Sequence, residues 1–126
     1  MDFKTLIHVN EMGRWGMALG SINNFLNAVD GDETDIVVLA NGEGVRGYLV
    51  CGDKLSGKGH CSTGMTGHIS MMASLNKKGV SFLACKNALV AHGIKTEDLP
   101  EFVIVVPAGM VVLVKLQHEG FAYIKP

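Results

Sequence analysis

A cysteine at a change of structural period is the residue in this chain best placed to do chemistry. Residues 80–85 form a short apolar run that suits a buried strand, and residues 86–92 then follow a short helical pattern that ends at Gly93. Cys85 lies at the junction. The exposed N–H groups and the positive end of the helix dipole favour a thiolate over a thiol there, and Lys86 adds a positive charge. The pattern predicts a reactive cysteine.

Other polar or small residues lie near the ends of the predicted strands. In a parallel sheet these ends share one edge, which is where open α/β folds bind ligands. A thiol, an imidazole and several amides would meet there, and such a set suits a thiolate nucleophile beside a group that gives or takes protons. No acid is evident to orient the histidine, so a protease-like triad is not supported. The predicted pocket residues are His8, Asn10, Asn41, Lys86, Asn87, Pro107 and Gly109.

Structural roles are the alternative for the same residues. Buried cysteine is common and usually inert, so Cys85 is also consistent with core packing. His8 is equally consistent with a histidine that only completes a hydrogen-bond network. Asn10 and Asn41 suit turns and caps, in which the side chain binds nearby backbone. The residue types alone leave both interpretations open.

A second group of possible ligands lies in and after the glycine-rich segment from Gly52 to Gly64, which is predicted to be an exposed loop. His60, Cys61 and His68 are residue types that bind zinc, but their spacing matches no usual zinc pattern. No metal is therefore expected. Glycine pairs elsewhere do not complete a dinucleotide or phosphate-loop fingerprint, so no cofactor is expected either.

The elements that must position these residues alternate between strands and helices. Apolar, β-branched runs predict strands at 3–9, 36–40, 80–85, 102–106 and 121–124. Helical spacing is strongest over 14–29. Weaker patterns predict helices over 45–50, over 66–78 with Thr66 as N-cap, and over 86–92. The segment 110–118 is ambiguous between strand and helix. This alternation predicts an α/β fold with a parallel sheet of about five strands and helices on both faces.

Composition limits the classes of function. The 126 residues allow one domain, residues 1–126, and charged residues make up only 18% while hydrophobic residues make up 48%. We therefore expect another subunit to cover some apolar surface. The net charge of -1, without a basic stripe, gives nucleic-acid binding no electrostatic support. Neither a bilayer-spanning apolar run nor a secretory signal is evident, so a cytoplasmic protein is expected, and three cysteines in a reducing compartment favour free thiols.

Taken together, several segments resemble the DsrE/DsrF-like family of intracellular sulfur-handling proteins. The resemblance covers nearly the whole chain and includes the stretch GVSFLACKNAL around Cys85. The segments that carry it are 7–11, 18–24, 39–42, 79–89, 105–109 and 120–126.

This resemblance implies a three-layer α/β/α domain with a five-stranded parallel sheet and a homo-oligomer, a trimer or hexamer. It also implies sulfur relay, in which Cys85 accepts sulfane sulfur as a persulfide from a donor protein and passes it to the thiol of an acceptor protein. Cys61 is a possible second thiol that resolves the product on Cys85. Whether this role amounts to enzymatic sulfurtransferase activity stays open. The alternative is a non-catalytic oligomeric binding or assembly protein with a small-ligand pocket at the carboxyl edge of the sheet.

Overall fold

The computed structural model describes residues 2–49 and 63–126, with the side chains of its second segment described from His68 onward. Its centre is a five-stranded, all-parallel sheet in the order β4-β3-β2-β1-β5. All five predicted strands are confirmed. Their bounds are β1 (Asp2–Val9), β2 (Glu33–Ala40), β3 (Ser81–Cys85), β4 (Val103–Val106) and β5 (Ala122–Ile124).

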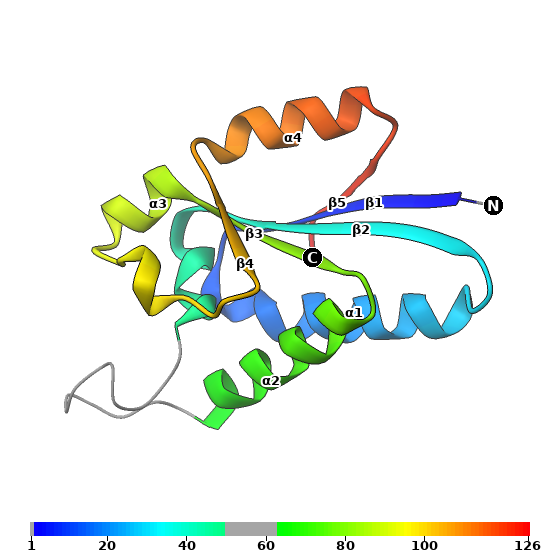
Figure 1. Cartoon of the computed structure of the whole chain (residues 1–126), viewed down its shortest axis with the longest axis horizontal. Helices are drawn as coiled ribbons and strands as arrows, with labels where there is room; N and C mark the ends of the chain where they lie inside the picture. The colour runs from blue at the N-terminus through cyan, green and yellow to red at the C-terminus, as the bar shows by residue number, and fades with distance from the viewer. Residues whose placement is uncertain (1, 50–62) are drawn as a thin grey trace.

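Helices cover both faces of the sheet, so the predicted three-layer α/β/α architecture is confirmed (Figure 1). The α-helices are α1 (Trp15–Ala28), α2 (Thr63–Lys77), α3 (Lys86–Ala91) and α4 (Gly109–His118), and the 3-10 helices are η1 (Met12–Arg14), η2 (Gly42–Tyr48) and η4 (Thr96–Asp98). Helices α1 and α2 lie on one face, α4 lies on the other, and α3 lies at the carboxyl end of β3. No helix in the described part of the chain combines the length and the apolar character needed to cross a membrane.

The predicted start of α2 needs correction, and the structure specifies two further segments. Helix α2 begins at Thr63, so Thr66 lies inside it and is not its N-cap; glycines at 64 and 67 lower the helix propensity of this first turn and hide its start from the sequence. Residues 63 and 64 therefore belong to the helix, while 52–62 of the predicted loop lie outside the described residues. The short helix expected at 45–50 is the 3-10 helix η2. The ambiguous segment 110–118 is helical.

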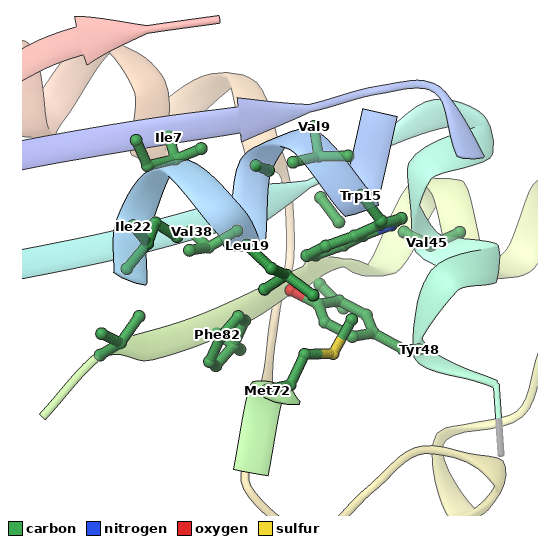
Figure 2. Packing of buried hydrophobic residues seen from close by; sticks show 14 of the residues in the cluster. Ile7, Val9, Trp15, Leu19, Ile22, Val38, Val45, Tyr48, Met72 and Phe82 are labelled. Atoms are coloured by element: carbon green, nitrogen blue, oxygen red, sulfur yellow. The ribbon is translucent and has the colours of Figure 1, made fainter. Parts of the chain in front are cut away.

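The larger core lies between the sheet and helices α1 and α2 (Figure 2). Trp15 is fully buried in it and donates its indole N–H to the Gly44 carbonyl at 2.7 Å. Gly47 packs directly on that indole, since a Cβ there would lie 2.0 Å from the indole nitrogen. Tyr48 is also fully buried, and its hydroxyl donates to the Leu83 carbonyl of β3 at 2.8 Å. Burial raises the pKa of Tyr48 well above its usual range, because the phenolate would lose its hydration.

The smaller core lies under α4, where Leu6, Val37, Leu39, Leu113 and Phe121 are buried together. This single helix covers only part of that face. Four large apolar side chains on α4 and β4 stay in contact with solvent: Ile104, Met110, Val111 and Val114, which are 55%, 67%, 63% and 51% exposed. The two long strands of the sheet, β1 and β2, have eight residues each and lie side by side, whereas the edge strands β4 and β5 have four and three.

Candidate functional site

Cys85 occupies the junction that its sequence predicts. It is the last residue of β3 and the N-cap of α3, with an extended backbone, and the residue is 7% exposed. Its side chain makes no capping hydrogen bond to α3. Instead the backbone N–H of Gly109, the first residue of α4, donates to Cys85 Sγ at 3.3 Å. The donor to the sulfur therefore comes from a helix that follows the cysteine by 24 residues.

Gly109 brings this contact about because it has no side chain. A Cβ on it would lie 3.3 Å from Cys85 Cβ, 3.2 Å from Leu39 Cδ2 and 3.5 Å from Asn41 Cβ. The start of α4 consequently rests on β2 and β3 at closer range than any other residue type permits without displacement. Cys85 and Asn41 flank the same point, which agrees with the register, since Ala40 and Ala84 are paired neighbours just before them.

His8 continues the polar group towards the other edge of the sheet. It is 8% exposed on β1, and its ring is held at both nitrogens. Nε2 lies 2.8 Å from Asn41 Oδ1, and Nδ1 lies 2.6 Å from the hydroxyl oxygen of Tyr123 on β5. The strand order β3-β2-β1-β5 therefore carries a row of polar side chains across the sheet: Cys85, Asn41, His8 and Tyr123.

This row can do two things chemically. A backbone N–H directed at sulfur stabilises a thiolate, which is the reactive form of cysteine. A histidine with a hydrogen-bonded partner on each nitrogen has a defined ring orientation, and its tautomer is set by those partners. Among the predicted pocket residues, the structure thus brings Cys85, Asn41, Gly109 and His8 together.

The remaining predicted residues make no hydrogen bond to this row within the described part of the chain. Lys86 and Asn87 are exposed on the first turn of α3, and Pro107 is exposed before α4. Asn10 packs against the start of η2, where Gly42 approaches its carbonyl oxygen, and its side-chain oxygen is buried without a hydrogen-bond partner among the described residues.

The second predicted group is only partly within the structure. His60 and Cys61 lie outside the described residues. His68 is described, and its Nε2 lies 3.6 Å from the place where a Gly16 Cβ would be. Within residues 2–49 and 63–126 no three metal-binding side chains gather.

Tyr123 is the member of the row that the sequence does not single out. The prediction of a last strand included it, but only the pairing of β5 with β1 reveals its role. Tyr123 is paired with Leu6, two residues before His8 on the same face of β1. Its hydroxyl, at the end of a long side chain, is the group that reaches the ring. The sequence feature that could have pointed to Tyr123 is an aromatic hydroxyl on the last predicted strand.

A cavity of about 490 Å³ lies elsewhere, along β1 and β5 on the side of α1, with Phe3, Ile22, Phe25 and Ile124 among its lining residues. Two smaller cavities, of about 290 and 240 Å³, are also lined by residues other than Cys85, Asn41 and His8. None of these three cavities is lined by a residue of the polar row.

Comparisons with known proteins agree with this architecture. A solved structure, described as a protein of unknown function MTH1491 from Methanobacterium thermoautotrophicum, is similar, with a TM-score of 0.77 and 29% sequence identity over 99% of this chain and 100% of that one. A comparison with curated proteins finds no match. The model of the DsrE/DsrF-like family matches residues 3–126. Because that match spans nearly the whole chain, the protein belongs to the DsrE/DsrF-like family.

Proposed function

We propose that this chain is a cytoplasmic sulfur-relay protein that carries sulfane sulfur on Cys85. Membership of the DsrE/DsrF-like family supports a role in sulfur relay in general. The observation that carries the assignment to Cys85 is the hydrogen bond from the Gly109 N–H, 3.3 Å from the sulfur at the start of α4. A charge-assisted hydrogen bond of this kind favours negative charge on the sulfur, and the partial positive charge at a helix N-terminus acts in the same direction.

The relay consists of two exchange steps. In the first, the Cys85 thiolate attacks the terminal sulfur of a donor persulfide, R–S–SH. The donor's S–S bond breaks, the donor leaves as a thiolate that takes up a proton, and Cys85 becomes a persulfide. In the second, an acceptor thiolate attacks the terminal sulfur on Cys85 and releases the Cys85 thiolate. The donor supplies the oxidised sulfur, so no further oxidant is needed.

Access to the sulfur is the structural requirement of this proposal. Cys85 is 7% exposed, and the first turn of α4 lies against it. Transfer therefore requires the segment from Pro107 to Gly109 to move away from β3. We expect the thiol of the native protein to react with small reagents at a measurable rate that is slower than in the unfolded chain.

The test is mass spectrometry of the native protein after incubation with a low-molecular-weight persulfide. We expect an added mass of one sulfur atom on the peptide that contains Cys85. A variant with Cys51→Ser and Cys61→Ser keeps only Cys85 and should load equally, while Cys85→Ser should not load at that site. An adduct confined to Cys51 or Cys61, or no adduct on the native chain, contradicts the proposal.

The burial of Cys85 favours a second candidate, the non-catalytic binding or assembly protein. Cys85 packs in the larger core with Ala84, Ala88 and Leu89, as a structural cysteine does. In this case Cys85→Ala preserves the oligomer and every binding property, and the thiol of the folded protein reacts only as fast as the chain unfolds. The rate of Cys85 alkylation, compared with the unfolding rate, distinguishes the two candidates.

In both candidates we propose a homo-oligomer, a trimer or hexamer. The exposed apolar side chains on α4 and β4 support this proposal, because a helix that is apolar beyond its buried stripe usually meets another surface. A cavity of about 290 Å³ between α4 and β3–β4 adds to the same face. Light scattering should give three or six times the chain mass of 13.4 kDa, and a monomer at micromolar concentration contradicts it.

A further inference from the structure

We propose that the cavity along β1 and β5 is a second binding site, which takes a small, uncharged, elongated apolar molecule with one hydrogen-bonding end. The cavity measures about 490 Å³. Pockets that bind small molecules measure about 300–1,000 Å³ and are mainly apolar with a few polar groups. No residue of the polar row lines this cavity, so the inference goes beyond the sulfur relay and does not depend on it.

The floor of the cavity is apolar and buried. Ile7 on β1 and Ile22 on α1 lie side by side (Figure 2), and they are only 5% and 2% exposed. Phe3 and Phe25 also line the cavity, with ring centroids 5.4 Å apart and ring planes at 90°. This edge-to-face arrangement is favourable for two aromatic rings. A ligand therefore meets an apolar surface that is already formed.

The cavity is longer than it is wide because it follows the strands. Phe3, Thr5 and Ile7 all line it, and four steps of about 3.3 Å along a strand span about 13 Å. On β5, Ala122 is paired with Thr5 and Ile124 with Ile7, so the edge strand continues the same surface. A chain-like molecule suits this shape.

The rim of the cavity favours a small molecule over another protein surface. Asp2, Lys4 and Ser21 line the cavity and are exposed, whereas its bulky apolar residues, apart from Ile124, are buried or half-buried. The face of α4 is the opposite case, since its apolar side chains at Met110 and nearby positions are more than half exposed. Recessed apolar groups can be reached by a small ligand, while exposed ones are typical of contacts between subunits.

The charged groups at the rim are not directed into the cavity. Lys4 Nζ donates to the Glu119 carbonyl at 3.1 Å and lies 5.8 Å from the centroid of the Phe121 ring. Phe121 belongs to the core under α4, so the Lys4 side chain lies on that face of the sheet. Side chains alternate along a strand, and Asp2 therefore shares this face with Lys4. A charged ligand would lose its hydration in the cavity without gaining a partner.

Two hydroxyl groups can bind the polar end of the ligand. Thr5 lies between Phe3 and Ile7 on one face of β1, and Ser21 is on α1 four residues before Phe25. Neither hydroxyl has a hydrogen-bond partner among the residues that the structure describes. A ligand hydroxyl can donate to one of them and accept from the other.

The test is methyl NMR of the native protein, labelled at its isoleucines and titrated with butan-1-ol, hexan-1-ol and octan-1-ol. We expect saturable shifts of the isoleucines that line the cavity and none of those elsewhere. Each added methylene should strengthen binding about fourfold, as about 0.8 kcal/mol per buried CH₂ implies. The reporters are Ile7, Ile22, Ile36 and Ile124, and the internal controls are Ile69, Ile94 and Ile104.

Two variants assign the binding to this cavity. Ala122→Trp fills it from β5 and should abolish the binding of octan-1-ol, while Ala91→Trp, the same substitution on the exposed side of α3, should bind as the wild type does. Thr5→Val keeps the shape of the side chain and removes its hydroxyl, so we expect binding about 3- to 10-fold weaker. If Ala122→Trp does not fold, as a melting curve would show, the pattern of shifts in the wild type decides.

Three outcomes overturn the inference. The first is the absence of saturable shifts at millimolar octan-1-ol, and the second is shifts of equal size at the control isoleucines. The third is a cavity closed by a second copy of the chain, in which case octan-1-ol does not bind the native protein and Ala122→Trp lowers its mass in light scattering. Because no readout involves Cys85, each of these results leaves the sulfur relay standing, and an unreactive Cys85 leaves this site standing.

Discussion

Replacing Tyr48 with phenylalanine should destabilise the protein at neutral pH and lose that effect in alkali. Tyr48 is fully buried, its ring packs 5.1 Å from that of Trp15, and its hydroxyl donates to the Leu83 carbonyl two residues before Cys85. The variant keeps the ring and removes the hydrogen bond. A buried neutral hydrogen bond contributes about 1 kcal/mol, so we expect the wild type to be more stable by that amount at pH 8.

The pH dependence follows from the raised pKa of Tyr48. Below about pH 10, the ordinary pKa of tyrosine, the Tyr48 hydroxyl is protonated in both the folded and the unfolded chain. The difference in the free energy of unfolding between wild type and Tyr48→Phe is therefore constant there. Above it, the unfolded chain releases the proton and the folded chain keeps it, so the unfolded state binds fewer protons and stability falls with pH. One pH unit above the ordinary value the loss is about 1.4 kcal/mol. It exceeds the contribution of the hydrogen bond, so the two stabilities should cross between about pH 10.5 and 11.

The assay is urea unfolding of wild type and Tyr48→Phe from pH 8 to 11.5, followed by far-ultraviolet circular dichroism. All other titrating groups are common to both proteins, so the difference in the free energy of unfolding isolates Tyr48. A difference that stays near 1 kcal/mol through pH 11.5 would show that the hydroxyl ionises as readily in the folded chain as in the unfolded one. That result would refute the argument from burial.

Three further predictions concern glycines and the exposed helix face. Gly47→Ala should lower the free energy of unfolding by about 2–3 kcal/mol, because its methyl group would overlap the Trp15 indole. Gly20→Ala, in an open position inside α1, should raise the free energy of unfolding by about 0.5–1 kcal/mol. Chemical denaturation measures both changes. Gly109→Ala should slow sulfur uptake on Cys85 several-fold while the chain stays folded, because the methyl group displaces the N–H donor. Equal uptake rates for the variant and the wild type in mass-spectrometric time courses would contradict this prediction. Val114→Lys should shift the protein towards monomer in light scattering, since a charge would be buried in the proposed interface, and an unchanged mass would exclude that face.

The sequence indicates the elements well because their signals are local. Alternation of apolar runs and helical spacing depends on neighbouring residues, so all five strands and the position of Cys85 between strand and helix could be predicted. Helix α4 was ambiguous because its valines favour strands, and packing of Leu113 over the sheet decides its structure. The start of α2 was misplaced because glycines weaken the first turn.

The candidate site depends on contacts between distant segments, which a single sequence does not reveal. The donor to Cys85 was expected from the adjacent α3, but the contact comes from Gly109, because the register of the sheet and the absence of a side chain let α4 approach. Tyr123 was assigned no role because its partner His8 is 115 residues away and becomes a neighbour only through the strand order. Residue type identified His8 and Asn41, but the bond between them required the fold.

The strand lengths also bear on how the protein avoids uncontrolled polymerisation. A parallel sheet with open ends can act as a template for another chain, and a long flat border strand makes ribbon growth easy. Here the eight-residue strands are sheltered in the middle, and the borders offer only four and three residues, the latter followed by Lys125 and Pro126. Such short borders give an incoming strand few backbone partners, so the rims of this sheet are poor templates for the growth of a ribbon.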